Sequence, residues 1–393
     1  MDIFMIFSLL GGLAFFLYGI NLMSSGLEKV AGGKLEQLLK KMTSNPVKSF
    51  AMGAGITAII QSSSAVTVML VGLVNSGIMR LSQTVSVVIG SNVGTTITAW
   101  ILSLTGIQGT TGFILKLFKP ESFTPILALI GVILIMAAKS NKRKNIGTIM
   151  MGFAILMFGM ALMADSMAPL ANLPGFGQAM IAFHNPILGF LVGMIITMIV
   201  QSSSASIGIL QALTITAGVP VGVAIPIILG QNLGACIAPI FASIGVNTNA
   251  KRVSGVYVIY NILSVGICFP MFIILQLIFD FAFVHTNISP AGIALFHTTY
   301  NIFTAIMLFP FAKVIEKLAI RFIPDKADEH KVFLDERLLL SPNLAIAEAH
   351  NKAIKMSARV EKNVIYATKL LKRFESKKAE VIGINEDKIL RKN

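Results

Sequence analysis

The interval between Asp165 and Lys251 contains no Lys, Arg, Asp or Glu, although it is long enough for several helices. A water-soluble domain needs charged residues across its surface, so an interval of this length without any does not fold in water. The whole composition agrees, since 55% of the residues are hydrophobic, 13% are charged and the mean hydropathy is +0.79. The sequence therefore predicts an integral membrane protein.

The chain carries two copies of one structural unit. The sequence Gln61 to Ala65 returns unchanged at Gln201 to Ala205, a shift of 140 positions (the difference between 61 and 201), and the shift holds on both sides. The further pairs are Gly12 and Gly152, Gly19 and Gly159, Asn45-Pro46 and Asn185-Pro186, Gly53 and Gly193, Thr57 and Thr197, and Gly90-Asn92-Gly94 and Gly230-Asn232-Gly234. Duplicated polar breaks in apolar segments indicate a secondary transporter and point to its substrate site.

Two kinds of membrane segment are predicted. Apolar segments long enough to span lie at residues 3–27, 82–105, 122–139, 145–165, 220–244, 253–279 and 291–315. The segments that hold the Gln-Ser-Ser-Ser sequences, 46–79 and 186–216, each read as two short helices around a polar break. An arm of about fifteen residues is about 22 Å long, less than the roughly 30 Å hydrocarbon core, so each is predicted to be a re-entrant hairpin.

The basic residues predict an inverted topology. They gather in short loops at 29–48, 139–144 and 251–252 and again from Lys313, as the positive-inside rule requires of cytoplasmic loops. Each repeat then crosses the membrane an odd number of times, so the second repeat is inverted and the two hairpin tips meet near the midplane. Lys116 and Lys119 on the outside are the exception. We expect the first repeat at 1–144, and the second with the final span at 145–320, both in the inner (plasma) membrane.

A soluble helical tail is expected at residues 321–393, on the cytoplasmic side. Half of the 32 basic residues lie in this segment, and residues 334–380 alternate apolar and charged positions as an amphipathic helix does. A helix pair of this size buries little core alone. We therefore expect it to pack on a partner, on a second copy of the chain in a homo-oligomer or tail-mediated dimer, or on the rest of a larger domain.

The two polar breaks suit an anion. Ser62 to Ser64 and Ser202 to Ser204 would present hydroxyl groups and free backbone N–H groups at the positive ends of helices that start near Ala65 and Ala205. The alternative is that these serines only bond their own backbone or join neighbouring helices, which two identical clusters at identical repeat positions make the weaker interpretation.

A second polar element follows each break. Residues 90–98 read Gly-Ser-Asn-Val-Gly-Thr-Thr-Ile-Thr, and residues 230–238 read Gly-Gln-Asn-Leu-Gly-Ala-Cys-Ile-Ala. Paired glycines around an Asn predict an unwound stretch, whose carbonyl, amide and hydroxyl oxygens are hard ligands that suit Na⁺. The alternative is a helix-packing glycine motif. Because no Lys or Arg lies near either element, a buried divalent anion would need co-bound cations.

With these residues the chain resembles the type II sodium/phosphate cotransporter family, over roughly residues 5 to 320. Bacterial members carry a cytoplasmic PhoU-like helical domain, and residues 333–338 resemble its beginning. The resemblance implies Na⁺-driven uptake of inorganic phosphate, with phosphate at the hairpin tips and Gln and Thr side chains in the sodium sites. One departure is that Ala235 and Ala238 replace Thr95 and Thr98, which puts a sodium site in the second repeat in doubt.

The resulting hypothesis is an all-α, polytopic, Na⁺-coupled phosphate importer with inverted repeats that works by alternating access. The expected phosphate residues are Ser62, Ser63, Ser64, Ser202, Ser203, Ser204, Asn92 and Asn232. The expected sodium residues are Gln61, Gln201, Ser91, Thr95, Thr96 and Thr98. Na⁺ is the coupling ion, and no other cofactor is expected.

Three rival interpretations remain. The same machine could carry another oxyanion, which competition of phosphate uptake would reveal, or the chain could be a phosphate sensor that signals through its tail. A membrane enzyme is disfavoured, because the apolar region offers no paired carboxylates, no Cys with His and no metal-ligand spacing. The net charge of +14 lies in loops and predicts no nucleic-acid partner. His297 and Asn301 share one helix face and could relay protons, although packing is the commoner role.

Overall fold

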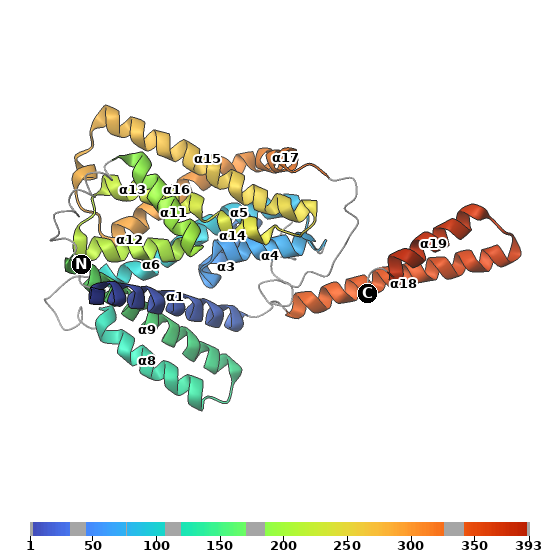
Figure 1. The fold of residues 1–393 in the computed structure, drawn as a ribbon, viewed down its shortest axis with the longest axis horizontal. Helices are drawn as coiled ribbons and strands as arrows, with labels where there is room; N and C mark the ends of the chain where they lie inside the picture. The colour runs from blue at the N-terminus through green and yellow to red at the C-terminus, as the bar shows by residue number, and fades with distance from the viewer. Residues whose placement is uncertain are drawn as a thin grey trace.

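The computed structural model describes residues 3–31, 45–75, 77–106, 119–169, 185–325 and 342–390. These residues are helical apart from turns and one isolated bridge between Pro220 and Asn287, which confirms the all-α prediction. Figure 1 shows a bundle of helices with a two-helix arm at one end. Lys116, residues 333–338 and most of the first basic loop lie outside the described residues.

Five helical stretches of the described chain are long and apolar enough to cross a membrane, which confirms a polytopic membrane protein. They are α1 (Ile3–Ala31), α5 to η1 (Leu81–Gly106), α9 (Asn141–Met167), α13 to α14 (Val221–Ala242) and α15 (Thr248–Phe279). The other two expected spans form the shorter helices α8 (Pro120–Ala137) and α16 (Pro290–Leu308). The turn between α8 and α9 lies at 138–140, a few residues before the expected repeat boundary.

Equivalent helices of the two repeats pack on each other through glycines. A Cβ on Gly19 of α1 would lie 2.8 Å from the Gly152 carbonyl oxygen of α9, and a Cβ on Gly159 would lie 2.7 Å from the Gly12 carbonyl oxygen. The backbones can approach this closely only because these positions lack a side chain. Since Gly12 and Gly152 are equivalent, as are Gly19 and Gly159, the contact is reciprocal, as at a two-fold axis, and the two helices are antiparallel.

The Gln-Ser-Ser-Ser segments form helical hairpins that are too short to span. The first consists of α3 (Pro46–Ile60) and α4 (Ser63–Asn75), and the second of α11 (Pro186–Val200) and α12 (Ser203–Ala217). Each begins with an Asn cap, Asn45 or Asn185, followed by Pro at the first helical position, where its missing N–H costs nothing. Figure 1 shows α3 and α4 toward the end with the arm and α11 and α12 toward the opposite end.

Each hairpin packs on a broken helix. The first packs on α5 (Leu81–Gly94), which continues as α6 (Thr96–Ser103) and η1 (Leu104–Gly106), and the second on α13 (Val221–Gly234), which continues as α14 (Ile237–Ala242). A Cβ on Gly53 would lie 2.1 Å from the Val87 carbonyl oxygen, and one on Gly193 the same 2.1 Å from that of Ile227. The unwound stretches predicted at the paired glycines are not present, because 90–94 and 230–234 are helical and the first break is confined to Thr95, which itself keeps right-handed helical angles (φ −62°, ψ −23°).

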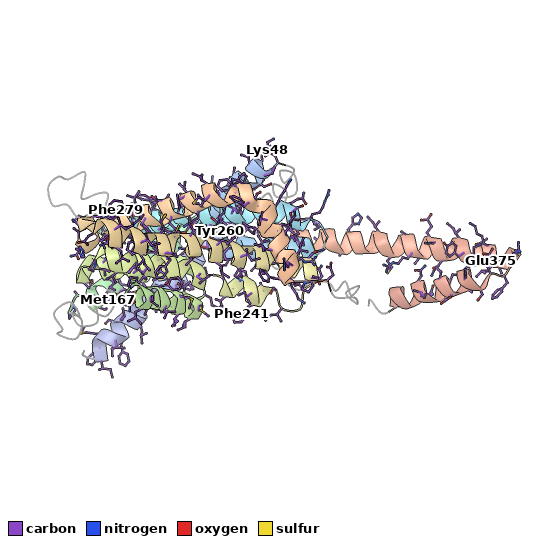
Figure 2. All side chains as sticks on the ribbon, turned by 90° about the horizontal axis from the view of Figure 1, so that it is seen from above. Lys48, Met167, Phe241, Tyr260, Phe279 and Glu375 are labelled. Atoms are coloured by element: carbon purple, nitrogen blue, oxygen red, sulfur yellow. The ribbon has the colours of Figure 1, made fainter. Side chains whose placement is uncertain are left out.

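The remaining helices complete the body and the arm. The bundle includes α15, α16, the short helices η3 (Ala282–His285) and η4 (Phe309–Phe311), and the amphipathic α17 (Ala312–Phe322). The arm is an antiparallel pair, α18 (Pro342–Lys372) and α19 (Ser376–Leu390), so the amphipathic stretch expected at 334–380 forms a helix pair divided by a turn at 373–375. Figure 2 shows Met167 and Phe279 at one end of the body. Glu375, in the turn of the arm, lies beyond the opposite end.

Candidate functional site

The tip of each hairpin is a left-handed residue followed by a capped helix. Gln61 has φ 61° and Gln201 has φ 57°, the αL conformation that ends a helix, and the N–H of each donates to a threonine carbonyl four residues back. Ser62 Oγ then accepts a hydrogen bond from Ala65 N–H (3.1 Å), and Ser202 Oγ accepts one from Ala205 N–H (3.2 Å). The two tips therefore have the same backbone geometry, and each leads directly into the N-terminus of a helix.

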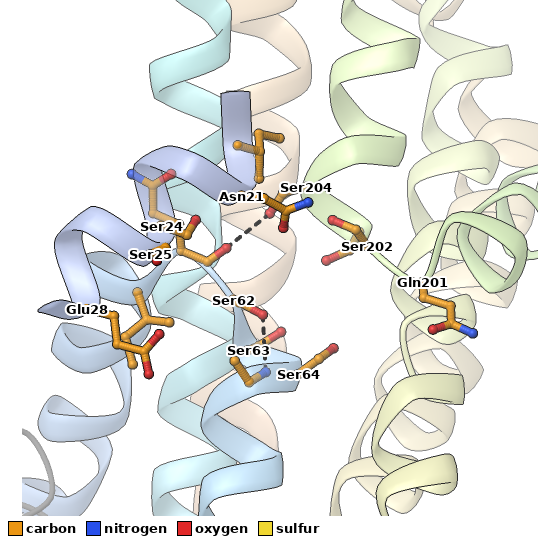
Figure 3. A pocket seen from close by; sticks show the side chains of 15 residues that line it. Asn21, Ser24, Ser25, Glu28, Ser62, Ser63, Ser64, Gln201, Ser202 and Ser204 are labelled. Atoms are coloured by element: carbon orange, nitrogen blue, oxygen red, sulfur yellow. Dashed lines mark hydrogen bonds between the residues drawn. The ribbon is translucent and has the colours of Figure 1, made fainter. Parts of the chain in front are cut away.

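The two tips lie together around one cavity. Ser204 Oγ of the second tip donates to the Gln61 carbonyl oxygen of the first at 3.4 Å. The cavity has a volume of about 340 Å³, and both serine clusters line it. Figure 3 shows the serines of the two tips on either side of this space. The N-termini of α4 and α12 thus contribute free backbone N–H groups and positive dipole ends to one cavity, an arrangement that favours an anion.

One wall of the cavity was missed by sequence reasoning. It is formed by α1, whose residues Asn21, Ser24, Ser25 and Glu28 line the same space and are seen along one side in Figure 3. Their spacing of three, four and seven residues places them on one helix face, so a polar stripe along a predicted span was the available signal. Glu28 is the one ionisable side chain among the described residues that line the cavity.

The asparagines expected to steady the anion lie elsewhere. Neither Asn92 nor Asn232 lines the cavity, and both are buried. Asn92 Nδ2 donates to the Val88 carbonyl oxygen and Asn232 Nδ2 to that of Ile228, both at 2.9 Å. Asn232 Oδ1 also lies 3.4 Å from His297 Nε2. One hydrogen of each side-chain N–H₂ is therefore used within the residue's own helix, and both side chains lie inside the helix bundle and not at the cavity.

The residues expected to bind sodium divide into two groups. Gln61, Thr95 and Thr98 are buried, and Gln61 Oε1 and the two threonine Oγ1 atoms form no hydrogen bond within the described chain. Ser91 and Thr96 are also buried, but their hydroxyls donate to the carbonyl oxygens of Val88 and Val93. Gln201 is exposed and lines the cavity.

The sequence analysis did not identify several other buried side-chain oxygens that lack a hydrogen-bond partner among the described residues. Thr57 Oγ1 forms no hydrogen bond to the described residues, and its Cβ lies 2.9 Å from where a Cβ on Gly94 would stand, next to Thr95. The second repeat has Thr197 Oγ1, Ser206 Oγ and Gln231 Oε1 in the same condition, although it lacks Thr at 235 and 238. A buried acceptor without a donor is costly unless a ligand satisfies it, so both repeats hold oxygens that could face a cation.

Comparison of the sequence with known proteins finds a matching family. Residues 15–165 and 177–300 match the model of the Na⁺/Pi-cotransporter family. Protein YqeW of Bacillus subtilis is 29% identical over 316 residues, which cover 79% of this chain and 96% of that protein. YjbB of Salmonella typhimurium, which carries the name of an inorganic phosphate export protein, is 24% identical over 90% of this chain and 63% of its own length.

A mammalian relative matches a shorter segment. The sodium-dependent phosphate transport protein 2A of Rattus norvegicus is 35% identical over 99 residues, which cover 24% of this chain and 15% of that protein. No solved structure matches the chain. The match to the family model therefore lies in the membrane part of the sequence, which contains both hairpins.

Proposed function

Because this chain belongs to the Na⁺/Pi-cotransporter family, we propose that it is a secondary transporter that carries inorganic phosphate across the membrane together with Na⁺. The observation that carries the proposal is the cavity of about 340 Å³ between the two Gln-Ser-Ser-Ser tips. Relatives in the family are named for phosphate transport and for sodium dependence, which supports the choice of substrate and coupling ion over another oxyanion.

Phosphate is expected to bind between the tips. Ser62 to Ser64, Ser202 and Ser203 supply hydroxyl donors, Ser204 lines the same space with its O–H directed at the Gln61 carbonyl oxygen, and the first turns of α4 and α12 supply backbone N–H groups. No Lys or Arg lines the cavity within the described chain, so these neutral donors would share the anion's charge with co-bound cations. This requirement links the anion to Na⁺ physically, because an uncompensated dianion inside a membrane protein is too costly.

Sodium is expected beside the tips. Gln61 Oε1, Thr57 Oγ1, Thr95 Oγ1 and Thr98 Oγ1 are buried oxygens of the first repeat that lack a donor among the described residues. Hydroxyl and amide oxygens are ligands that hard cations prefer. A Na⁺ ion held there would lie next to the tip that binds phosphate, which gives each ion a reason to raise the affinity for the other.

Alternating access would move the hairpins against the α1–α9 pair. The two hairpins start from opposite ends of the body and meet at the cavity, so a small rocking movement would open the cavity to one end or the other. The stripe on α1 that contains Asn21 and Glu28 would then line the path to the end with the arm.

The test is uptake of labelled phosphate into proteoliposomes that contain the purified protein. An imposed Na⁺ gradient should drive uptake, whereas a K⁺ gradient or a proton gradient of the same size should not. Unlabelled phosphate should compete, and sulfate or a dicarboxylate should not. If sulfate competes and phosphate does not, phosphate is not the substrate. If uptake does not depend on the Na⁺ gradient, Na⁺ is not the coupling ion.

The direction of net transport has two candidates. An inward Na⁺ gradient drives import, which is the direction we propose, whereas the name of YjbB favours export. In cells loaded with labelled phosphate, an exporter lowers the retained label when the chain is expressed, and an importer raises uptake from the medium. Measuring both fluxes in one strain distinguishes the two candidates.

A further inference from the structure

The hydroxyl of Tyr257 reaches the tip of the first hairpin from the other repeat. Tyr257 lies on α15, is 1% exposed, and its hydroxyl oxygen is 3.1 Å from Ser63 Oγ. Ser63 begins α4 and lines the cavity between the tips, whereas Tyr257 does not line it. The hydroxyl of Tyr257 therefore stands directly behind one of the serines that face the cavity.

This contact is part of a fixed interface between α4 and α15. At the other end of α4, Asn247 N–H donates to Asn75 Oδ1 (3.0 Å), and Asn247 Nδ2 donates to the Asn75 carbonyl oxygen (2.9 Å). Ser63 meets Tyr257 and Asn75 meets Asn247, so the two helices are antiparallel and joined at both ends. Leu70, Val71 and Val256 belong to the apolar core between these ends. The position of the Tyr257 hydroxyl behind Ser63 is therefore held by packing along the whole length of α4.

The proton inventory of the pair decides what the contact can do. A serine hydroxyl has one proton and two lone pairs, and a tyrosine hydroxyl can donate or accept. If the Ser63 O–H donated this hydrogen bond to the Tyr257 oxygen, Ser63 would face the cavity with lone pairs and would repel an anion. If Tyr257 donates to Ser63 Oγ, the Ser63 proton is free to point into the cavity, and the two hydrogen bonds in sequence polarise and strengthen each other.

Resting on the proposed function, we propose that Tyr257 is a positioning residue for phosphate binding, because its O–H donates to Ser63 Oγ and so directs the Ser63 O–H toward the anion. Tyr257 itself lies beyond the part of the repeat in which the shift of 140 positions was traced, which ends at Gly94 and Gly234. The first tip is thus prepared as a donor by a residue of the second repeat.

The test is Tyr257→Phe, which keeps the buried ring and removes only the hydroxyl. The matched control is Tyr260→Phe, because Tyr260 lies one turn further on α15, is also 1% exposed, and its hydroxyl pairs with Thr304 Oγ1 (3.2 Å) away from the cavity. In Na⁺-driven uptake, Tyr257→Phe should raise the half-saturating phosphate concentration about threefold to tenfold, the size expected of one hydrogen bond. The maximal rate should change little, and Tyr260→Phe should match wild type.

A double-mutant cycle with Ser63→Ala separates positioning from a merely structural role. Once the Ser63 hydroxyl is gone, adding Tyr257→Phe should have no further effect on phosphate half-saturation. An equal loss in both backgrounds, or no loss in Tyr257→Phe alone, overturns the assignment. If wild type itself fails to take up phosphate, the proposed function is wrong instead.

A second variant keeps the test open if Tyr257→Phe is not recovered folded. Incorporation of 3-fluorotyrosine at position 257 preserves the shape of the side chain and makes its hydroxyl a stronger donor. Phosphate half-saturation should then fall below that of wild type. A rise, or no change, contradicts the proposed direction of the hydrogen bond.

Discussion

Thr98 offers the sharpest test of the sodium site, because its hydroxyl should affect the empty and the loaded protein in opposite directions. Thr98 is 1% exposed, and its Oγ1 has no hydrogen-bond partner in the described part of the chain. Thr98→Val replaces the hydroxyl with a methyl group of similar size and leaves the packing in place. A buried, unsatisfied polar group costs about 1–3 kcal/mol, so the Na⁺-free variant should be at least as stable as wild type.

The loaded protein should lose affinity. If Thr98 Oγ1 is a Na⁺ ligand, its removal should cost about 1.5–3 kcal/mol, the size of a hydrogen bond to a charged group, which is about tenfold to a hundredfold in Na⁺ half-saturation. Through linkage, phosphate affinity should also fall at subsaturating Na⁺ and recover at high Na⁺. The assays are thermal unfolding in Na⁺-free detergent and Na⁺ titration of phosphate uptake.

The matched control is Thr84→Val on the neighbouring helix α5. Thr84 is 0% exposed, but its Oγ1 already donates to the Leu81 carbonyl oxygen at 2.7 Å. This control should lose a little stability and keep the wild-type dependence on Na⁺. A Thr98→Val protein that is less stable without Na⁺ and unchanged in its Na⁺ titration would show that Thr98 only packs the core, and the sodium site would have to be sought elsewhere.

Further predictions concern the tips, the topology, the glycine contacts and the α1 wall. Ser63→Ala and Ser203→Ala should each weaken phosphate uptake at limiting phosphate by about tenfold to a hundredfold, since each removes a donor to a charged ligand; normal uptake by both would refute the tip site. In a background without Cys236 and Cys268, a cysteine at Ser140 should react only from the cytoplasm and one at Asn172 only from outside, so equal sidedness would rule out inverted repeats. Gly53→Ala should destabilise the protein by about 1–3 kcal/mol in thermal unfolding, because its Cβ would lie 2.1 Å from the Val87 carbonyl oxygen. Gly55→Ala, with nothing within 4 Å of its Cβ, should be neutral or stabilise it by up to about 1 kcal/mol, and an equal loss in both would contradict the packing. Glu28→Gln should lower the half-saturating phosphate concentration, measured by phosphate titration at fixed Na⁺, because it removes a like charge from the cavity. A higher half-saturating phosphate concentration would show instead that the carboxylate holds a cation.

The membrane setting, the duplication and the positions of the hairpin tips were all predictable from the sequence. Each depends on local information: the charge-free interval after Asp165, the shift of 140 positions, and a polar break too close to the ends of its segment for a full span. The left-handed Gln61 and Gln201 and the capping Ser62 and Ser202 follow from the same few residues. Local sequence sets such features because backbone angles and caps involve only near neighbours.

Which residues line the cavity could be determined only from the tertiary structure. Asn92 was expected at the phosphate site, yet it does not line the cavity and its amide donates to the Val88 carbonyl oxygen, while the glycines beside it allow close helix packing. The α1 face that contains Glu28 became visible only once α1 lay beside the tips. Tyr257 stands 194 positions from Ser63, and no local pattern links the two. Contacts between distant segments are selected by how whole helices pack, and a single sequence carries no direct record of that choice.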